Sequence, residues 1–190
     1  MNVFQNAEKV NFLIIGFGNR HRRDDGIGPY VSDQLKLSLG NTPGIRIVSL
    51  HQLGPELAED LWTATGVIFI DADNGPLPGG CSWSDVRPVS GMNRNIHSLL
   101  VNTLLGMTQL IYNRCPPAWM VSVKGYDFGF GEGLSPEAAD SANRAAGEII
   151  NFIMNGFVNP AQNASAYSSA GSCDPMLCTA RLINNRKGLI

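Results

Sequence analysis

The sequence predicts an α/β domain in which a mostly parallel, twisted sheet of about five strands lies between layers of helices. Three observations lead to this prediction. Uninterrupted apolar runs at residues 12–15 and 67–70 are typical of strands buried on both faces of a parallel sheet. Segments with apolar residues at helical spacing alternate with such runs. Glycine and proline mark most boundaries, and the order β-α-β-α-β-β-α-β-α favours parallel strands joined by helices.

The first strand, residues 12–15, leads into a glycine turn and then a helix. Gly16 and Gly18 allow the backbone to turn sharply. The helix is indicated by apolar residues at helical spacing, namely Ile27, Val31 and Leu35. Asp24 and Asp25 lie between turn and helix, at the carboxyl end of the strand. Open α/β sheets bind ligands at that edge, so we expect the functional site there.

A glycine turn of this kind also suits a dinucleotide site. The Rossmann fingerprint needs a third glycine directly before the helix, where this chain has His21. Asp24 and Asp25 would also repel a phosphate at the helix start, so the pattern disfavours nucleotide binding. Either aspartate could simply cap the helix. A single aspartate would suffice as a cap. The more specific hypothesis is that a metal or a cationic group lies between the pair and a partner.

The remaining elements follow the same alternation. We expect the first helix to end at Gly40, a strand over residues 44–50 to end at His51, and a second helix to begin near Pro55, with Leu57 and Leu61 buried. The run at 67–70 ends in Asp71, and residues 81–86 have the mixed polarity of an edge strand.

A long third helix should follow His97, with Ser98 as its cap. Its predicted buried face comprises Leu100, Leu104, Met107 and Ile111. Residues 118–123 form the last expected strand, and Ser135 begins a final helix that reaches Met154.

Size, composition and charge limit the possible functional classes. The chain has 190 residues, of which 44% are hydrophobic and 16% charged, and this suits one α/β domain over residues 1–157. A net charge of −2 gives no reason to expect nucleic acid or an anionic membrane as partner. No apolar run reaches the roughly 20 residues of a membrane span. A secretory signal is not recognisable and the cysteines are few and scattered, so we expect a cytoplasmic protein.

Composition changes after residue 157. Residues 159–172 are small and polar without any period, so we expect residues 158–190 to form a disordered or loosely packed extension. Cys173 and Cys178 have four residues between them and no second pair, which disfavours a zinc site.

Two of the three histidines are candidate metal ligands. His51 ends the second strand and His97 begins the third helix, positions that in a doubly wound sheet lie on the edge that carries Asp24 and Asp25. Two imidazoles and a carboxylate would suit a borderline divalent metal such as nickel or zinc. Each histidine alone could instead be a capping or packing residue. We expect His21 to be solvated.

Other polar residues allow two interpretations each. Asp71 could orient a histidine or cap the following turn. The position of Glu56 in the first turn of the second helix favours an interaction with the helix dipole over a role as a metal ligand. The basic cluster of Arg20, Arg22 and Arg23 is either a solvated loop or a clamp for a peptide carboxylate or an acidic partner. Neither a Gly-x-Ser-x-Gly elbow nor a His-Glu-x-x-His helix is present in the sequence.

Several motifs, in their order along the chain, resemble those of the hydrogenase maturation proteases. They are GFGNRHRRDDGIG at 16–28, HQLGPELAEDL at 51–61, IDAD at 70–73, the histidine that opens a leucine-rich helix at 97–105, and VKGYDFGFGEGLSPEA at 123–138. The ordered set is far more specific than any one motif. The second motif is most similar to the branch that serves bidirectional, NAD(P)-linked hydrogenases.

This resemblance implies a three-layer α/β/α fold of the phosphorylase/hydrolase-like type and a cytoplasmic, aspartyl-type endopeptidase. Members of the family remove a C-terminal peptide from the large subunit of a nickel-iron hydrogenase after nickel insertion. By position, the resemblance implies Asp25, His51 and His97 as nickel ligands, with Asp25 as the catalytic residue. Better-known members have aspartate in place of His51.

The resemblance also implies a partner and a cofactor. The partner is the hydrogenase large-subunit precursor, and the nickel is carried by that precursor and held weakly or not at all by the free protein, which we expect to be a monomer. Two other functions stay open: a peptidase of the same fold with another substrate, and a non-catalytic chaperone that senses nickel loading. A defined C-terminal truncation of the precursor would indicate the enzyme.

Overall fold

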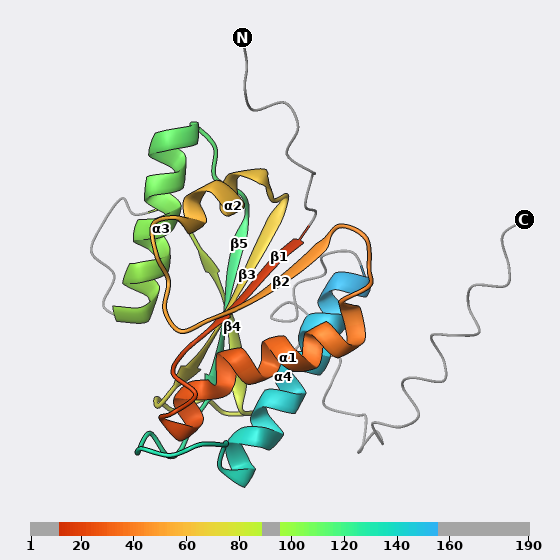
Figure 1. Cartoon of the computed structure of the whole chain (residues 1–190), viewed down its shortest axis with the longest axis vertical. Coiled ribbons are helices and arrows are strands. Elements are labelled where there is room, and N and C mark those ends of the chain that lie inside the picture. Colours follow the sequence, from red (N-terminus) through yellow and green to blue (C-terminus); the bar gives the residue numbers. More distant parts are fainter. Residues whose placement is uncertain (1–11, 89–95, 156–190) are drawn as a thin grey trace, which may run out of the picture. The chain divides into compact units, whose positions relative to one another are not determined.

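A computed structural model of the chain describes residues 12–88 and 96–155, with side chains in the third helix from residue 100 onward. Within these residues, five strands form one sheet in the order β2-β1-β3-β5-β4 (Figure 1). The strands are β1 (Phe12–Phe17), β2 (Ile45–Leu50), β3 (Gly66–Asp73), β4 (Cys81–Val86) and β5 (Ala118–Lys124). All pairs are parallel except β4 with β5, and the predicted fold class is therefore confirmed.

Helices cover both faces of this sheet. They are the short η1 (Arg23–Gly26), α1 (Ile27–Leu39), α2 (Leu57–Thr63), α3 (Ile96–Tyr112) and α4 (Pro136–Met154). Helices α1 and α4 bury one face of the sheet, with Ile14, Ile70 and Val121 in the core between them. Helices α2 and α3 bury the other face, over Ile15, Phe69 and Met120. The alternation of side chains along each strand thus supplies two separate cores, which is why every residue of β1 is buried.

The strand order creates a switch point at β1. The chain leaves β1 through α1 to β2 on one side, and then returns past β1 to β3 on the other side. The connections that leave the carboxyl ends of β1 and β3 therefore run in opposite directions along the sheet, and this is the edge at which such sheets bind ligands. The start of α1 can approach it closely because residue 28 is glycine. A Cβ at Gly28 would overlap the carbonyl oxygens of Phe17 and Ile70.

Two sequence predictions for α3 are wrong. The helix begins at Ile96, so Ser98 lies inside its first turn and is not its cap. The buried residues are Val101, Asn102, Leu104, Leu105 and Thr108. Of the predicted face, Leu104 is buried and Met107 is half-buried, whereas Leu100 and Ile111 are 53% and 60% exposed. The helix carries apolar residues on more than one side, so periodicity could not show which side faces α2 and the sheet.

The last helix agrees with the sequence. Ser135 caps α4, with its hydroxyl accepting a hydrogen bond from the Ala138 amide. Among the described residues, no helix combines the length and apolar character needed to cross a membrane.

Candidate active site at the carboxyl edge of the sheet

Asp25 lies in a closed turn directly after β1. The Gly18 amide donates to the Leu50 carbonyl at 3.1 Å, so the chain stays beside β2 as it leaves the sheet. The Asn19 amide then donates to Asp25 Oδ2 at 2.9 Å. Gly18 has φ of +137°, and a Cβ there would overlap the Asp25 carbonyl oxygen, so glycine is required. The half-buried carboxylate of Asp25 is thereby held at the predicted edge.

His51 lies at the same edge. It directly follows Leu50, which is paired in register with Phe17 at the end of β1. The side chain of His51 is exposed. The backbone of His97 lies in the first turn of α3, but its side chain is outside the described residues.

Asp25 has a free coordination position of the kind a metal needs. Within the described part of the chain, its only side-chain hydrogen bond is the one from Asn19 to Oδ2, which leaves Oδ1 available. No three His, Cys, Asp or Glu side chains among those described could hold a metal ion together. The set of Asp25, His51 and His97 includes a side chain outside that search, and so it stays a prediction.

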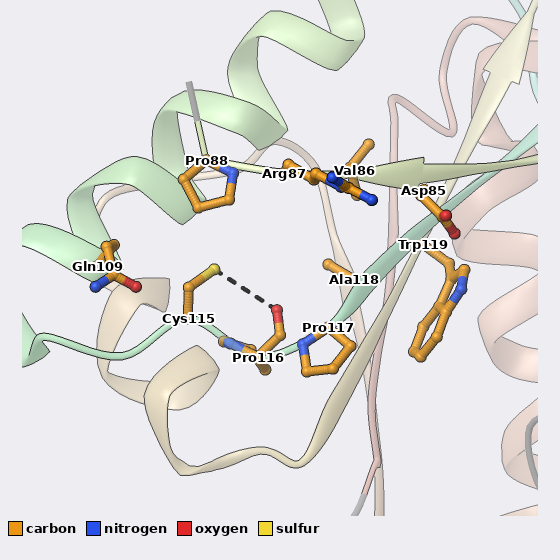
Figure 2. A pocket seen from close by; sticks show the side chains of 10 residues that line it. All are labelled: Asp85, Val86, Arg87, Pro88, Gln109, Cys115, Pro116, Pro117, Ala118 and Trp119. Atoms are coloured by element: carbon orange, nitrogen blue, oxygen red, sulfur yellow. Dashed lines mark hydrogen bonds between the residues drawn. The ribbon is translucent and has the colours of Figure 1, made fainter. Parts of the chain in front are cut away.

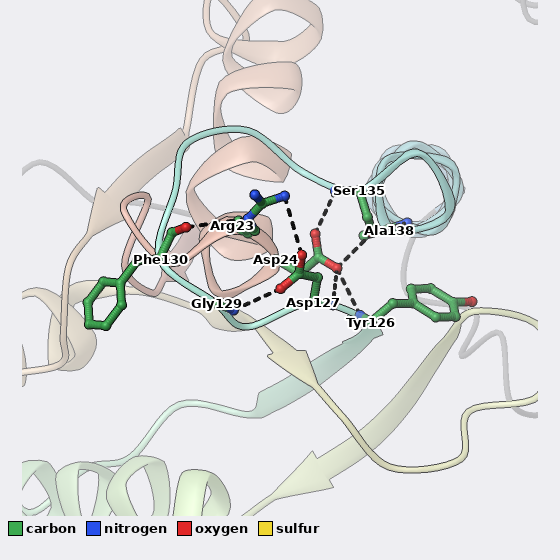
Figure 3. A network of polar contacts seen from close by, with 8 residues as sticks. All are labelled: Arg23, Asp24, Tyr126, Asp127, Gly129, Phe130, Ser135 and Ala138. Atoms are coloured by element: carbon green, nitrogen blue, oxygen red, sulfur yellow. Dashed lines mark hydrogen bonds and ion pairs between the residues drawn. The ribbon is translucent and has the colours of Figure 1, made fainter.

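Asp24 has a different position from its neighbour. It is buried, and its carboxylate accepts four hydrogen bonds from described residues, all from the segment between β5 and α4 (Figure 3). Oδ2 receives the Tyr126 and Asp127 amides, both at 2.8 Å, and the Ser135 hydroxyl at 2.7 Å. Oδ1 receives the Ser135 amide at 2.7 Å. Asp24 therefore does not cap the helix, since its carboxylate accepts its hydrogen bonds from a distant loop.

The pKa of the Asp24 carboxyl reflects these contacts. Burial raises it, but hydrogen bonds from the amides of Asp127, Ser135 and Tyr126 and from the Ser135 hydroxyl outweigh burial, so the pKa is lowered below its ordinary value. Asp24 is thus ionised at neutral pH, and each bond to it is charge-assisted.

Further backbone bonds join the two segments, which we call the locked loop (residues 125–135) and the basic turn (residues 20–25). The Arg23 amide donates to the Gly131 carbonyl at 3.0 Å, and the Gly131 amide donates to the His21 carbonyl at 2.9 Å. The Asp24 amide also donates to the Asp127 carbonyl at 3.0 Å. The locked loop is thereby attached to the turn that carries Asp25.

The arginines of the basic turn are not simply solvated. Arg20 pairs with Asp33 at 2.7 Å and also donates to Ser49 Oγ at 3.2 Å. Arg23 pairs with Asp127 at 3.3 Å. Arg22 donates to the Phe128 carbonyl at 3.1 Å. These contacts hold the basic turn against α1, β2 and the locked loop.

The other polar candidates occupy structural or exposed positions. His21 is exposed, as predicted, with its Nδ1 3.5 Å from Glu132 Oε1. Asp71 does not end its strand, because β3 continues to Asp73. It is buried, and its Oδ1 accepts a hydrogen bond from the Ala72 amide. Glu56 is exposed at the N-cap position of α2.

A separate hollow of about 470 Å³ lies at the opposite edge of the sheet (Figure 2). Its wall includes Val86 at the end of the antiparallel β4, Ala118 at the start of β5, and Cys115.

Burial raises the pKa of the Cys115 thiol. Burial, and then the charge of Glu148, raise the pKa of Cys81 to about 12. Neither of these two thiols supplies a thiolate nucleophile at neutral pH.

Comparison with known proteins gives matches to structures alone. No protein-family model and no curated protein matches the chain. The hydrogenase maturating endopeptidase HybD from E. coli matches with a TM-score of 0.58 at 18% identity, over 77% of this chain and 94% of its own. The [NiFe] hydrogenase maturation protease HycI from Thermococcus kodakarensis matches with a TM-score of 0.58 at 21% identity, over 77% and 94%.

A third structure is slightly more similar in sequence. The hydrogenase 2 maturation peptidase from a Thaumarchaeota archaeon is 25% identical, with a TM-score of 0.56, over 76% of this chain and 98% of its own. The fold is therefore an α/β fold that peptidases use. In particular, it is the fold of the solved hydrogenase maturation proteases.

Proposed function

We propose that this protein is a cytoplasmic endopeptidase that removes the C-terminal peptide of a nickel-iron hydrogenase large-subunit precursor after nickel insertion. The proposal rests on one observation. This chain has the fold of the solved maturation proteases. The turn that carries Asp25 is bonded to the end of β2 at the carboxyl edge of the sheet, and Oδ1 of Asp25 is available to a ligand. The motif at residues 51–61 favours a bidirectional, NAD(P)-linked hydrogenase as the source of the precursor.

The substrate brings the metal in this proposal. Nickel in the precursor binds to Asp25, His51 and His97, and it polarises the scissile carbonyl or a water. A water oxygen adds to the carbonyl carbon, the C–N bond breaks, and the proton from water passes to the departing amine. Asp25 serves either as a ligand alone or also as the base that takes the proton first. The bond from Asn19 to Oδ2 keeps the carboxylate oriented for both roles.

Processing should require nickel in the precursor. Three ligands, of which His51 is exposed, would hold free nickel weakly, so recognition should depend on nickel already fixed in the precursor. We expect the nickel-loaded precursor to be shortened at one defined bond and the metal-free precursor to stay intact. Mass spectrometry of the large subunit before and after incubation measures both.

The same measurement separates the other two functions. An unchanged mass of a loaded, bound precursor would indicate a nickel-sensing chaperone. If the protein binds no hydrogenase precursor, the remaining interpretation is a peptidase of the same fold with another substrate. Efficient cleavage of the metal-free precursor would contradict nickel-dependent recognition.

A set of substitutions tests His51 as a ligand. Glutamine keeps about the same volume but replaces the imidazole nitrogen by an amide, which is a poorer ligand for nickel. We expect His51→Gln to lower the rate of processing by more than about tenfold, because losing even a residue that orients a metal ligand costs about 10–100-fold. His51→Asp, which restores a metal-competent side chain, should retain more activity. Initial rates of precursor cleavage give the order.

His21→Gln is the matched control, because His21 is an exposed histidine on the neighbouring turn. It should process at the wild-type rate, and all three variants should keep the wild-type melting temperature. Wild-type activity of His51→Gln would remove His51 from the site.

A further inference from the structure

Phe130 presents an almost fully exposed aromatic ring at the tip of the locked loop. Its exposure is 89%, the highest among the large hydrophobic residues that the structure describes. Figure 3 shows the ring directed away from the hydrogen bonds around Asp24. Exposing an aromatic ring to water is unfavourable unless a partner covers it, and phenylalanine is enriched at protein interfaces relative to the rest of the surface.

The backbone that carries this ring is fixed on both sides. The Gly129 amide donates to Asp127 Oδ1 at 2.9 Å, and the Phe130 carbonyl accepts from Arg23 Nε at 3.5 Å. Gly131 is bonded in both directions to the basic turn. The buried Asp24 carboxylate anchors both ends of the loop, at Tyr126 and at Ser135. A partner that covers Phe130 therefore loses little entropy in ordering the loop.

Arg22 supplies a charge close to Phe130 along the backbone, because Arg22 forms a β-bridge with Gly131, the residue that follows Phe130. Of the three arginines in the basic turn, Arg20 and Arg23 are neutralised by Asp33 and Asp127. Over the described ranges, Arg22 has no carboxylate within ion-pair distance, and its guanidinium donates to the Phe128 carbonyl. That bond positions the group and leaves its charge for a carboxylate elsewhere.

We infer that Phe130 and Arg22 form a docking element for the large-subunit precursor, with the ring entering an apolar pocket of the precursor and the guanidinium pairing with one of its carboxylates. The inference rests on the proposed function. The precursor is the occupant because Arg22 and Asp25 share one turn: the Asp25 amide donates to the Arg22 carbonyl at 3.0 Å. A protein bound here lies against the reacting residue, and a second copy of this chain would obstruct it.

Helix α3 offers a competing surface. Leu100, Leu110 and Ile111 are 53%, 86% and 60% exposed on it. Leu110 and Ile111 lie at the end of α3 opposite His97, and no ion pair or hydrogen bond of the described residues links them to the turn that carries Asp25. Binding through α3 is therefore the alternative outcome of the test.

The test measures binding of the nickel-loaded precursor to the full chain carrying Asp25→Asn, so that the precursor stays uncleaved. In this background we expect Phe130→Ala to weaken binding by more than about tenfold and Arg22→Gln by about fivefold, within the range for residues that dominate an interface. The controls are Leu37→Ala, an apolar residue 83% exposed on α1, and Arg114→Gln, which also donates to a backbone carbonyl, that of Ala64. Both controls should bind like their parent.

Each result supports or overturns the docking element. Equal binding by Phe130→Ala and its parent overturns it, and weakening by Leu110→Ala alone assigns docking to α3. In the cleaving wild-type background, Phe130→Ala should raise KM and leave kcat unchanged. Binding without cleavage by the wild-type chain would contradict the proposed peptidase and still measure docking. Absence of any binding by the wild-type chain would overturn both.

Discussion

Replacing Asp25 by asparagine is expected to slow cleavage of the large-subunit precursor by several orders of magnitude. The amide oxygen of asparagine can still accept the Asn19 hydrogen bond, so the turn should keep its shape. The replacement loses the negative charge that a nickel ligand or a general base needs. We expect the rate to fall by about 10²–10⁴-fold, the usual contribution of a positioned acid or base. Mass spectrometry of the nickel-loaded precursor over time measures the loss.

Two controls limit the interpretation of that result. Asp140→Asn removes an exposed carboxylate from α4 and should leave processing unchanged. The melting temperature of Asp25→Asn should be within about 2 °C of the wild type, equivalent to less than about 1 kcal/mol for a chain of this size. Cleavage at the wild-type rate by a folded Asp25→Asn protein would exclude Asp25 from the chemistry.

The same substitution one residue earlier should have its main effect on stability. Asp24→Asn places an NH₂ group among donors from Tyr126, Asp127 and Ser135, and at least one of these donors loses its acceptor. Hydrogen bonds to a buried charged group contribute about 1.5–3 kcal/mol each. We expect a loss of about 3 kcal/mol, which lowers the melting temperature by about 6–12 °C for a chain of this size. Thermal unfolding at neutral pH measures it.

Thermal unfolding at low pH is the control for the explanation that the charge of Asp24 stabilises the fold. The pKa of Asp24 is lowered on folding, so the unfolded state binds the proton more readily and the stability from Asp24 increases with pH. This contribution is complete above the unfolded pKa of about 3.9 and is lost as pH falls through the lower folded value. The gap in melting temperature between wild type and Asp24→Asn should therefore narrow below about pH 4. A gap that does not narrow as the pH falls below the unfolded pKa would contradict a contribution from the ionised form of Asp24.

The class of the fold, and the edge of the sheet at which we expected the site, were predictable from the sequence. Apolar runs such as residues 67–70 are typical of buried strands, and Gly18 before Asp25 indicates a sharp turn at the end of the first one. The cap of the last helix at Ser135 was also predictable. Each of these features leaves a pattern among residues that are close in sequence. The sequence alone is therefore sufficient to predict them.

The different environments of the two aspartates could not be predicted from the sequence. Asp24 and Asp25 are adjacent and chemically identical, but Asp24 is bonded to Ser135, 111 positions further along the chain, and Asp25 to Asn19, six positions away. The sequence also did not indicate that Phe130 is exposed, or which side of α3 is buried. Local periodicity does not record which distant segment will cover a residue. That is decided when the sheet brings the ends of β1 and β5 to one edge and the loops that follow them form their hydrogen bonds.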